Sequence, residues 1–295
     1  MTRHPVLAAV DTSARSRMAA LWAAEEAARR GAPLRLVHAW PFPVSDPEHP
    51  RDADLRHGAQ AMLDEAVAMV RKAEPTVEVT GALVLDVAVD GLLVAAGGEA
   101  GAEVGAEVGA ELLVLGTRGL GGFHGLLVGS VSLAVASRAE LPVVLVREEP
   151  PTDPAELVVG LDVGEPAPAV LEFAFTQAAS MGLPLRVVHG WELPPMYGYA
   201  GWLPSEEEHH ELGSAAAKLV AEAVAPWREQ HPEVQVIPDV RAGGGAGALM
   251  LAAEHAALLV VGRRTRAHQF GARLGSVAHA VIHHAPAPVA VVPHD

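Results

Sequence analysis

The chain of 295 residues exceeds the usual size of one domain, because domains typically run to about 150 residues, so two domains are expected. Its formal net charge of −15 argues against a nucleic acid or an anionic membrane as partner, since both would repel the protein at long range. The chain has no cysteine, which excludes disulfides, thiolate metal sites and a thiol nucleophile.

The beginning of the chain lacks the features of a secretory signal. Residues 1–13 show no basic stretch followed by a long apolar run and a cleavage site. No segment offers 18 uninterrupted apolar residues, so no membrane span is expected. A cytoplasmic protein is the resulting expectation.

The chain contains an internal repeat with a period near 150 residues. An apolar segment that ends in an aspartate opens each half, with Asp11 in the first and Asp162 in the second. The matching pairs of segments are 6–11 with 157–162 and 33–40 with 184–191, both displaced by 151 positions, then 111–116 with 257–262 and 141–146 with 287–292, both displaced by 146. The chain is therefore two fused copies of one domain.

Between the apolar segments lie Ala-rich stretches with helical spacing. The expected helices include Arg15–Arg30, Leu55–Lys72, Pro168–Met181 and Leu212–Gln230. Short all-apolar strands that alternate with helices indicate a parallel sheet covered on both faces. Each half is thus expected to be a Rossmann-like, doubly wound α/β domain with a five-stranded parallel sheet.

A proline-rich acidic stretch marks the expected domain boundary. Domain 1 is expected to span 1–147 and domain 2 155–295, with 148–154 as the linker. The linker's three prolines and three acidic residues can neither continue a strand nor start a helix.

The displacement between the two copies changes from 151 to 146 positions at a short tandem expansion, Gly101–Glu111. We interpret this expansion as an extended or irregular helix end without a functional role.

A glycine-rich loop follows the fourth expected strand of the first half. In open α/β sheets ligands bind at the carboxyl ends of the strands, so this loop is a candidate site. Gly116, Gly119, Gly129 and Ser130 follow the spacing Gly, two residues, Gly, nine residues, Gly-Ser. Glycines permit close backbone approach, and loop amides next to a helix amino terminus can hold phosphate. Neither lysine lies in a glycine loop, which excludes a Walker-type NTPase.

The spacing of this loop resembles the ATP-binding signature of the universal stress protein family. The resemblance covers both halves, including the aspartate after the first strand and the terminal Pro-Val strand. It implies that ATP is the ligand, with any Mg²⁺ held mainly by the phosphates. By this resemblance, Ala9, Val10, Asp11 and Ala39 would border adenine and ribose, Gly116, Gly119, Gly129 and Ser130 would hold ribose and phosphates, and Val131 and Ser132 would add contacts.

The second copy departs from the signature at one position. The corresponding residues there are Asp162, Gly190, Gly262, Gly275, Ser276 and Val277, but Thr265 replaces the second glycine. A β-branched residue resists positive φ, so the site is expected to be weaker if the loop requires that geometry or a close backbone approach. Arg263, Arg264 and Arg266 could compensate in part by pairing with phosphate. Copy one is therefore expected to hold the better ATP site.

The last strand of each copy would be a sheet edge, and family members pair through this region. An internal pseudo-dimer is expected, while a homodimer between chains stays open. His38 and His189 are expected to hydrogen-bond at the ends of their strands, and no dedicated metal site is expected. Trp40 and Trp191 could stack on a base or serve packing.

Three functions are consistent with the sequence. The leading one is an ATP-binding stress-response regulator that acts through unidentified protein partners. The second is slow ATP hydrolysis or autophosphorylation, with Ser130 or Ser132 as the acceptor, although no catalytic base is evident. The third is a nucleotide-free interaction module.

Overall fold

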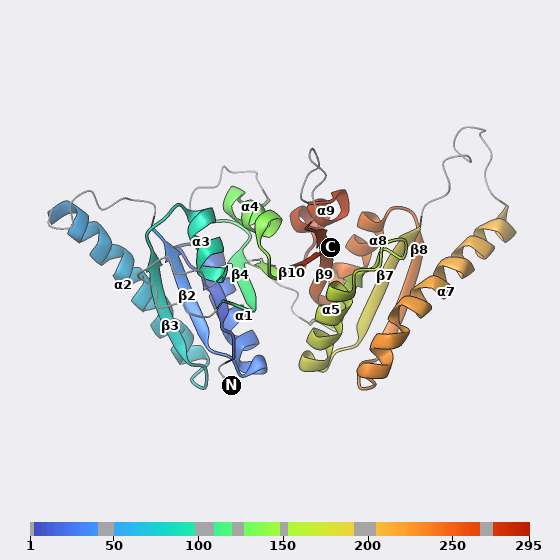
Figure 1. The fold of residues 1–295 in the computed structure, drawn as a ribbon, viewed down its shortest axis with the longest axis horizontal. Helices are drawn as coiled ribbons and strands as arrows, with labels where there is room; N and C mark the ends of the chain where they lie inside the picture. The colour runs from blue at the N-terminus through green and yellow to red at the C-terminus, as the bar shows by residue number, and fades with distance from the viewer. Residues whose placement is uncertain are drawn as a thin grey trace. The chain divides into compact units, whose positions relative to one another are not determined.

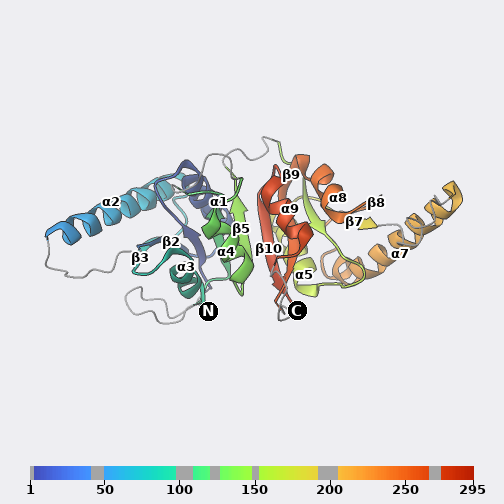
Figure 2. The same cartoon turned by 90° about the horizontal axis from the view of Figure 1, so that it is seen from above.

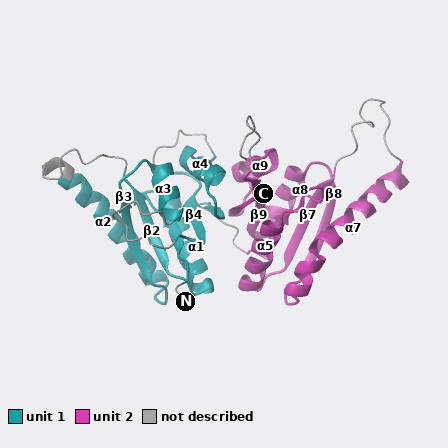
Figure 3. Ribbon diagram, viewed as in Figure 1, with its two compact units in different colours: residues 1–149 teal, residues 150–295 magenta. Residues whose placement is uncertain are grey.

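The structure is a computed structural model that describes residues 3–40, 50–97, 109–119, 127–147, 153–191, 205–265 and 274–295. The chain divides into two compact units, unit 1 with residues 1–149 and unit 2 with residues 150–295 (Figure 3). Most of the expected linker and of the Gly101–Glu111 expansion lies outside the described residues. Each unit is described by itself below.

Unit 1 contains a five-stranded sheet in the order β3-β2-β1-β4-β5, in which every pair of neighbours is parallel (Figure 1). Its elements are β1 (Val6–Ala9), α1 (Ala14–Arg30), β2 (Leu34–Ala39), α2 (Pro50–Ala73), β3 (Val79–Val84), α3 (Ala88–Gly97), β4 (Leu112–Gly116), α4 (Ser130–Arg138) and β5 (Val143–Val146). Figure 2 shows α2 and α3 on opposite faces of this sheet.

Unit 2 repeats this order as β8-β7-β6-β9-β10, again with all pairs parallel. Its elements are β6 (Glu156–Gly160), α5 (Pro168–Met181), β7 (Leu185–Trp191), α7 (Glu206–Gln230), β8 (Val236–Ala242), α8 (Gly245–Ala252), the 3₁₀ turn η1 (Ala253–His255), β9 (Ala256–Arg264), α9 (Ser276–His284) and β10 (Val289–His294). The predicted fold class is confirmed. In each unit the winding reverses beside the first strand, which opens a crevice at the carboxyl ends of the strands.

The core of each unit consists of small aliphatic side chains. All five residues of β4 are buried, and α1 buries five alanines against the sheet. Alanine lets a helix approach the sheet closely, which explains how a chain with only 4% aromatic residues fills its core. Gly31 and Gly182 end α1 and α5 in the left-handed conformation, with φ of 58° and 64°. None of the helices in the described ranges is long and apolar enough to cross a membrane.

An ion-pair network joins three strands of unit 2. Arg186 on β7 donates to Glu156 on β6 at 2.7 Å and to Asp239 on β8 at 3.2 Å, and Arg241 donates two further bonds to Asp239. These hydrogen bonds, first of all that from Arg241, lower the pKa of Asp239 below its ordinary value. The hydrogen bond to Glu156 raises the pKa of Arg186. The network holds the edge strand β8 onto the sheet.

Candidate functional site

In unit 1 the glycine loop after β4 lies against the aspartate after β1. A Cβ atom built on Gly119 would lie 2.5 Å from Oδ2 of Asp11. Among the described glycines only Gly31, Gly182 and Gly243 have positive φ. Gly119 is therefore required for the close approach to Asp11 rather than for a left-handed backbone.

Local hydrogen bonds fix the carboxylate of Asp11. Its Oδ1 accepts the backbone N–H of Ser13 at 2.8 Å, and Ser13 is the N-cap of α1. The hydroxyl of Ser16 donates to the Asp11 carbonyl at 2.7 Å and accepts the Asp11 N–H at 3.1 Å. Oδ2 of the same carboxylate faces Gly119.

The far end of the glycine loop leads into α4. The Gly129 N–H donates to the carbonyl of Thr117 at 2.7 Å and so closes the loop, of which residues 120–126 lie outside the described part of the chain. Gly129 is the N-cap and makes no side-chain cap bond. Ser130 is exposed, whereas Ser132 is buried and its hydroxyl donates to the Gly116 carbonyl at 2.8 Å. Of the two serines, Ser130 alone presents an accessible hydroxyl.

Two arginines add positive charge near this loop. Arg118 follows β4, and Arg147 follows β5, the neighbouring strand. Burial and the proximity of Arg118 lower the pKa of Arg147. The buried Nε of Arg118 has no hydrogen-bond partner. Two guanidinium groups therefore lie close together at the carboxyl edge of the sheet.

The histidines near the end of the second strand of each unit, His38 on β2 and His189 on β7, make the same contact. Nδ1 of His38 lies 2.8 Å from the carbonyl of Val10, and Nδ1 of His189 lies 2.9 Å from the carbonyl of Leu161. A neutral imidazole in this position donates from Nδ1. As expected, these histidines tie strand ends together. In the described part of the chain, no group of three or more His, Asp or Glu residues is arranged to hold a metal ion.

Unit 2 has a cavity of about 820 Å³ at the carboxyl edge of its sheet. The six residues predicted from the second copy all line it: Asp162, Gly190, Gly262, Gly275, Ser276 and Val277. Leu161, Val188 and Leu249 give it an apolar wall. Arg264, named from the sequence as a phosphate-pairing candidate, also lines it, and sequence reasoning missed three further titratable lining residues, namely Glu165, His294 and Asp295.

The loop after the fourth strand differs between the units. In unit 1 the pairing of β4 with β5 ends at Gly116 and Val146. In unit 2, β9 continues past Gly262, and Arg264 still pairs with His294 of β10. The N–H of Thr265 then donates to the His294 carbonyl at 2.7 Å. The backbone amide at this position is already used by the strand pairing, so it is not available to a ligand.

The described side chains that follow Gly262 are also buried or bonded. The Thr265 hydroxyl donates to Asp295 at 2.6 Å. Arg263 is 5% exposed, and Arg266 lies outside the described residues. Arg264 reaches the cavity but forms an ion pair with Glu165, which also lines it. A phosphate that approached Arg264 would have to compete with this carboxylate.

The universal stress protein family model matches residues 2–147 and 156–293. The chain belongs to the universal stress protein family. A universal stress protein of Mycobacterium tuberculosis is 31% identical over an alignment that covers 100% of this chain and 97% of the relative. The tandem organisation is thus shared over the full length.

Solved structures place this universal stress protein in a known fold. The crystal structure of a universal stress protein from Archaeoglobus fulgidus covers 99% of this chain and 98% of its own, with a TM-score of 0.66 and 16% identity. A universal stress protein in complex with cAMP is 29% identical over 50% of this chain, with a TM-score of 0.40, which is too low to support an argument about this chain's ligand. The ligand must be argued from the chain's own residues.

Proposed function

We propose that this universal stress protein binds ATP in the crevices at the carboxyl edges of its sheets and communicates nucleotide occupancy to protein partners. The observation that carries the proposal is the cavity of unit 2, because one pocket gathers all six residues that the glycine signature and the repeat selected independently of the structure. Its volume of about 820 Å³ lies in the range of small-molecule sites.

The walls of this cavity suit the parts of an adenine nucleotide. Leu161 and Leu249 offer apolar surface to a base, and the carboxylate of Asp162 can accept hydrogen bonds from ribose hydroxyls. Ser276 begins α9, whose N-cap, Gly275, makes no side-chain cap bond. The first-turn amides of α9 are then directed at an anion, as in other phosphate sites at helix amino termini.

Unit 1 is proposed to be the better ATP site. The N–H of Gly119 has no hydrogen bond within the described residues, whereas that of Thr265 is held by His294. Arg118 and Arg147 also supply positive charge at the carboxyl edge of the unit 1 sheet. A backbone amide that the fold leaves unbonded and nearby guanidinium groups both favour triphosphate binding.

The test is calorimetric titration of ATP with Mg²⁺ into the wild type, Gly119→Val and Gly275→Val. A Cβ on Gly275 would meet nothing within 4 Å, so its side chain would block the cavity without disturbing the fold. Gly58→Val, on the exposed side of α2 where a Cβ also meets nothing, is the matched control. Binding is expected to fall mainly in Gly119→Val and to stay unchanged in Gly58→Val.

Two outcomes would decide against the proposal. If the wild type binds no ATP, the proposal fails and the nucleotide-free interaction module takes its place. If ADP and phosphorylated protein accumulate during the titration, the protein is an ATPase or autokinase, and Ser130→Ala should abolish the phosphorylation. Because the Ser132 hydroxyl is buried against Gly116, Ser132 is not expected to be the acceptor.

A further inference from the structure

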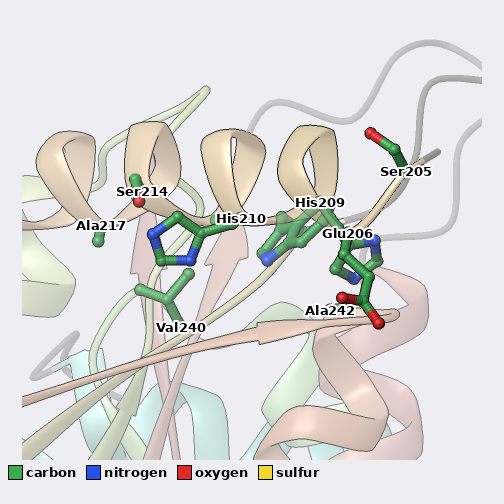
Figure 4. A pocket seen from close by; sticks show the side chains of 10 residues that line it. Ser205, Glu206, His209, His210, Ser214, Ala217, Val240 and Ala242 are labelled. Carbon is green, nitrogen blue, oxygen red and sulfur yellow. The ribbon is translucent and has the colours of Figure 1, made fainter.

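Unit 2 contains a second cavity, of about 660 Å³, which lies between α7 and the carboxyl ends of β7 and β8 (Figure 4). It is lined by Trp191, Ser205, Glu206, His209, His210, Gly213, Ser214, Ala217, Val240 and Ala242. None of these residues lines the cavity proposed for the nucleotide. Gly190 and Trp191 are neighbours on β7 and so point to opposite sides of the sheet, which separates the two cavities.

The cavity has an aromatic and aliphatic wall. The Trp191 ring contacts the imidazole of His209, with ring centroids 4.8 Å apart and planes tilted by 57°. Gly213 lies against the edge of the indole, where its lack of a side chain leaves room beside the ring. In unit 1 the equivalent Trp40, directly after β2, has its ring centroid 6.2 Å from that of His38.

Polar side chains of α7 face this wall. Figure 4 shows the imidazole of His210 turned toward Val240 and the carboxylate of Glu206 directed toward Ala242 at the end of β8. The side chains of Glu206, His210 and Ser214 make no hydrogen bond or ion pair within the part of the chain that the structure describes. They are available to a ligand.

The charge of the lining selects against anions. No lysine or arginine is among the residues that line the cavity, and Glu206 begins a helical turn that also carries Glu207 and Glu208. A phosphate or carboxylate would be repelled there, whereas an ammonium group would pair with Glu206. An aromatic ring would pack on the indole of Trp191. The cavity therefore matches a flat ring that carries a positive charge.

We propose that the cavity between α7 and β8 is a second ligand site, which takes a small planar aromatic amine. Its ring packs against Trp191, its ammonium group pairs with Glu206, and His210 and Ser214 offer hydrogen bonds to ring substituents. The site is independent of nucleotide binding because the two cavities share no lining residue.

The test uses two probes with the same ring and opposite charge, tryptamine and indole-3-acetate, titrated calorimetrically into the full chain. Tryptamine is expected to bind and indole-3-acetate is not. Trp191→Leu should weaken tryptamine binding about tenfold or more, and Glu206→Gln about threefold. Trp40→Leu, the equivalent change in unit 1, should leave the affinity unchanged.

Glu206 is exposed, so Glu206→Gln keeps the proposal testable even if Trp191→Leu disturbs β7. Saturating ATP should leave the tryptamine affinity unchanged. The proposal is overturned if tryptamine does not bind, if indole-3-acetate binds as tightly, if both variants bind like the wild type, or if ATP displaces the amine.

Discussion

The contact between Gly119 and Asp11 predicts the effect of adding a single methyl group. A Cβ on Gly119 would lie 2.5 Å from Oδ2 of Asp11, and real Cβ contacts are essentially never shorter than 3.0 Å. In Gly119→Ala the carboxylate or the loop must therefore give by about 0.5 Å or more, since packed groups cannot overlap.

That movement strains a hydrogen bond that organises the start of α1. Oδ1 of Asp11 accepts the Ser13 N–H at 2.8 Å, and a displacement of about 0.5 Å takes this bond past the usual limit of about 3.2 Å. Hydrogen bonds to charged groups contribute about 1.5–3 kcal/mol, and Asp11 is half-buried, so we expect a loss of stability of about 1 kcal/mol. A displaced carboxylate should also lower ATP affinity in unit 1 about tenfold.

Urea unfolding and calorimetric titration with ATP measure these two effects, and a double-mutant cycle isolates their cause. In an Asp11→Ala background the carboxylate is gone, so Gly119→Ala should cost little. Gly58→Ala, at an open helical position, should instead stabilise the protein by about 0.5–1 kcal/mol. An equal cost of Gly119→Ala in both backgrounds would refute the steric argument.

Three further predictions concern stability. Asp239→Asn should destabilise unit 2 near neutral pH, as measured by urea unfolding. Because the folded-state pKa of Asp239 is lowered, the stability difference between the variant and the wild type should vanish as pH falls through that folded-state pKa, below about 4. Ser132→Ala should cost about 1–2 kcal/mol in the same assay, because the buried Gly116 carbonyl loses its donor. Gly190→Ala should cost about 2 kcal/mol or more, because a Cβ there would lie 2.7 Å from the backbone of Gly245.

Gly190→Ala and Ser132→Ala each have a control variant, and Asp239→Asn is checked by its pH dependence. Gly247→Ala, in α8 with nothing within 4 Å of its Cβ, should not lower the stability. Ser137→Ala removes a serine hydroxyl that bonds only within its own helix, so it should cost less than Ser132→Ala. A pH-independent effect of Asp239→Asn between pH 7 and pH 3 would contradict the proposed ionic origin of its contribution.

The repeat made the fold predictable from the sequence. Two copies with the same alternation of apolar segments and Ala-rich stretches predict the same strand order, and the helix Pro168–Met181 begins and ends where expected. The helix expected from Leu212 begins at Glu206 instead. Ser205 and Glu208 form a capping box there, and the spacing of Ser and Glu was a signal that could have identified this start.

The contacts of the candidate site were not predictable from the sequence. The glycine signature and the repeat selected six residues that line the unit 2 cavity, yet the sequence left open whether Gly119 serves a positive φ or a close approach. Tertiary structure decides which residue faces a given glycine, and Gly119 faces Asp11. For the same reason the sequence did not show that β9 continues to Arg264, because this depends on pairing with His294. The pairing of the two units as a pseudo-dimer stays a prediction.

The extension of β9 has a consequence for the exchange of backbone hydrogens with solvent. The amide of Thr265 is bonded to His294 inside a sheet, whereas the amide of Gly119, at the equivalent place in the other copy, has no bond within the described residues. Amides of a sheet open rarely, so deuterium should enter Thr265 much more slowly than Gly119. The exchange rate of the Thr265 amide therefore provides an internal reference within the same chain. Slower exchange at Gly119 on addition of a ligand, relative to this reference, would report protection by the ligand.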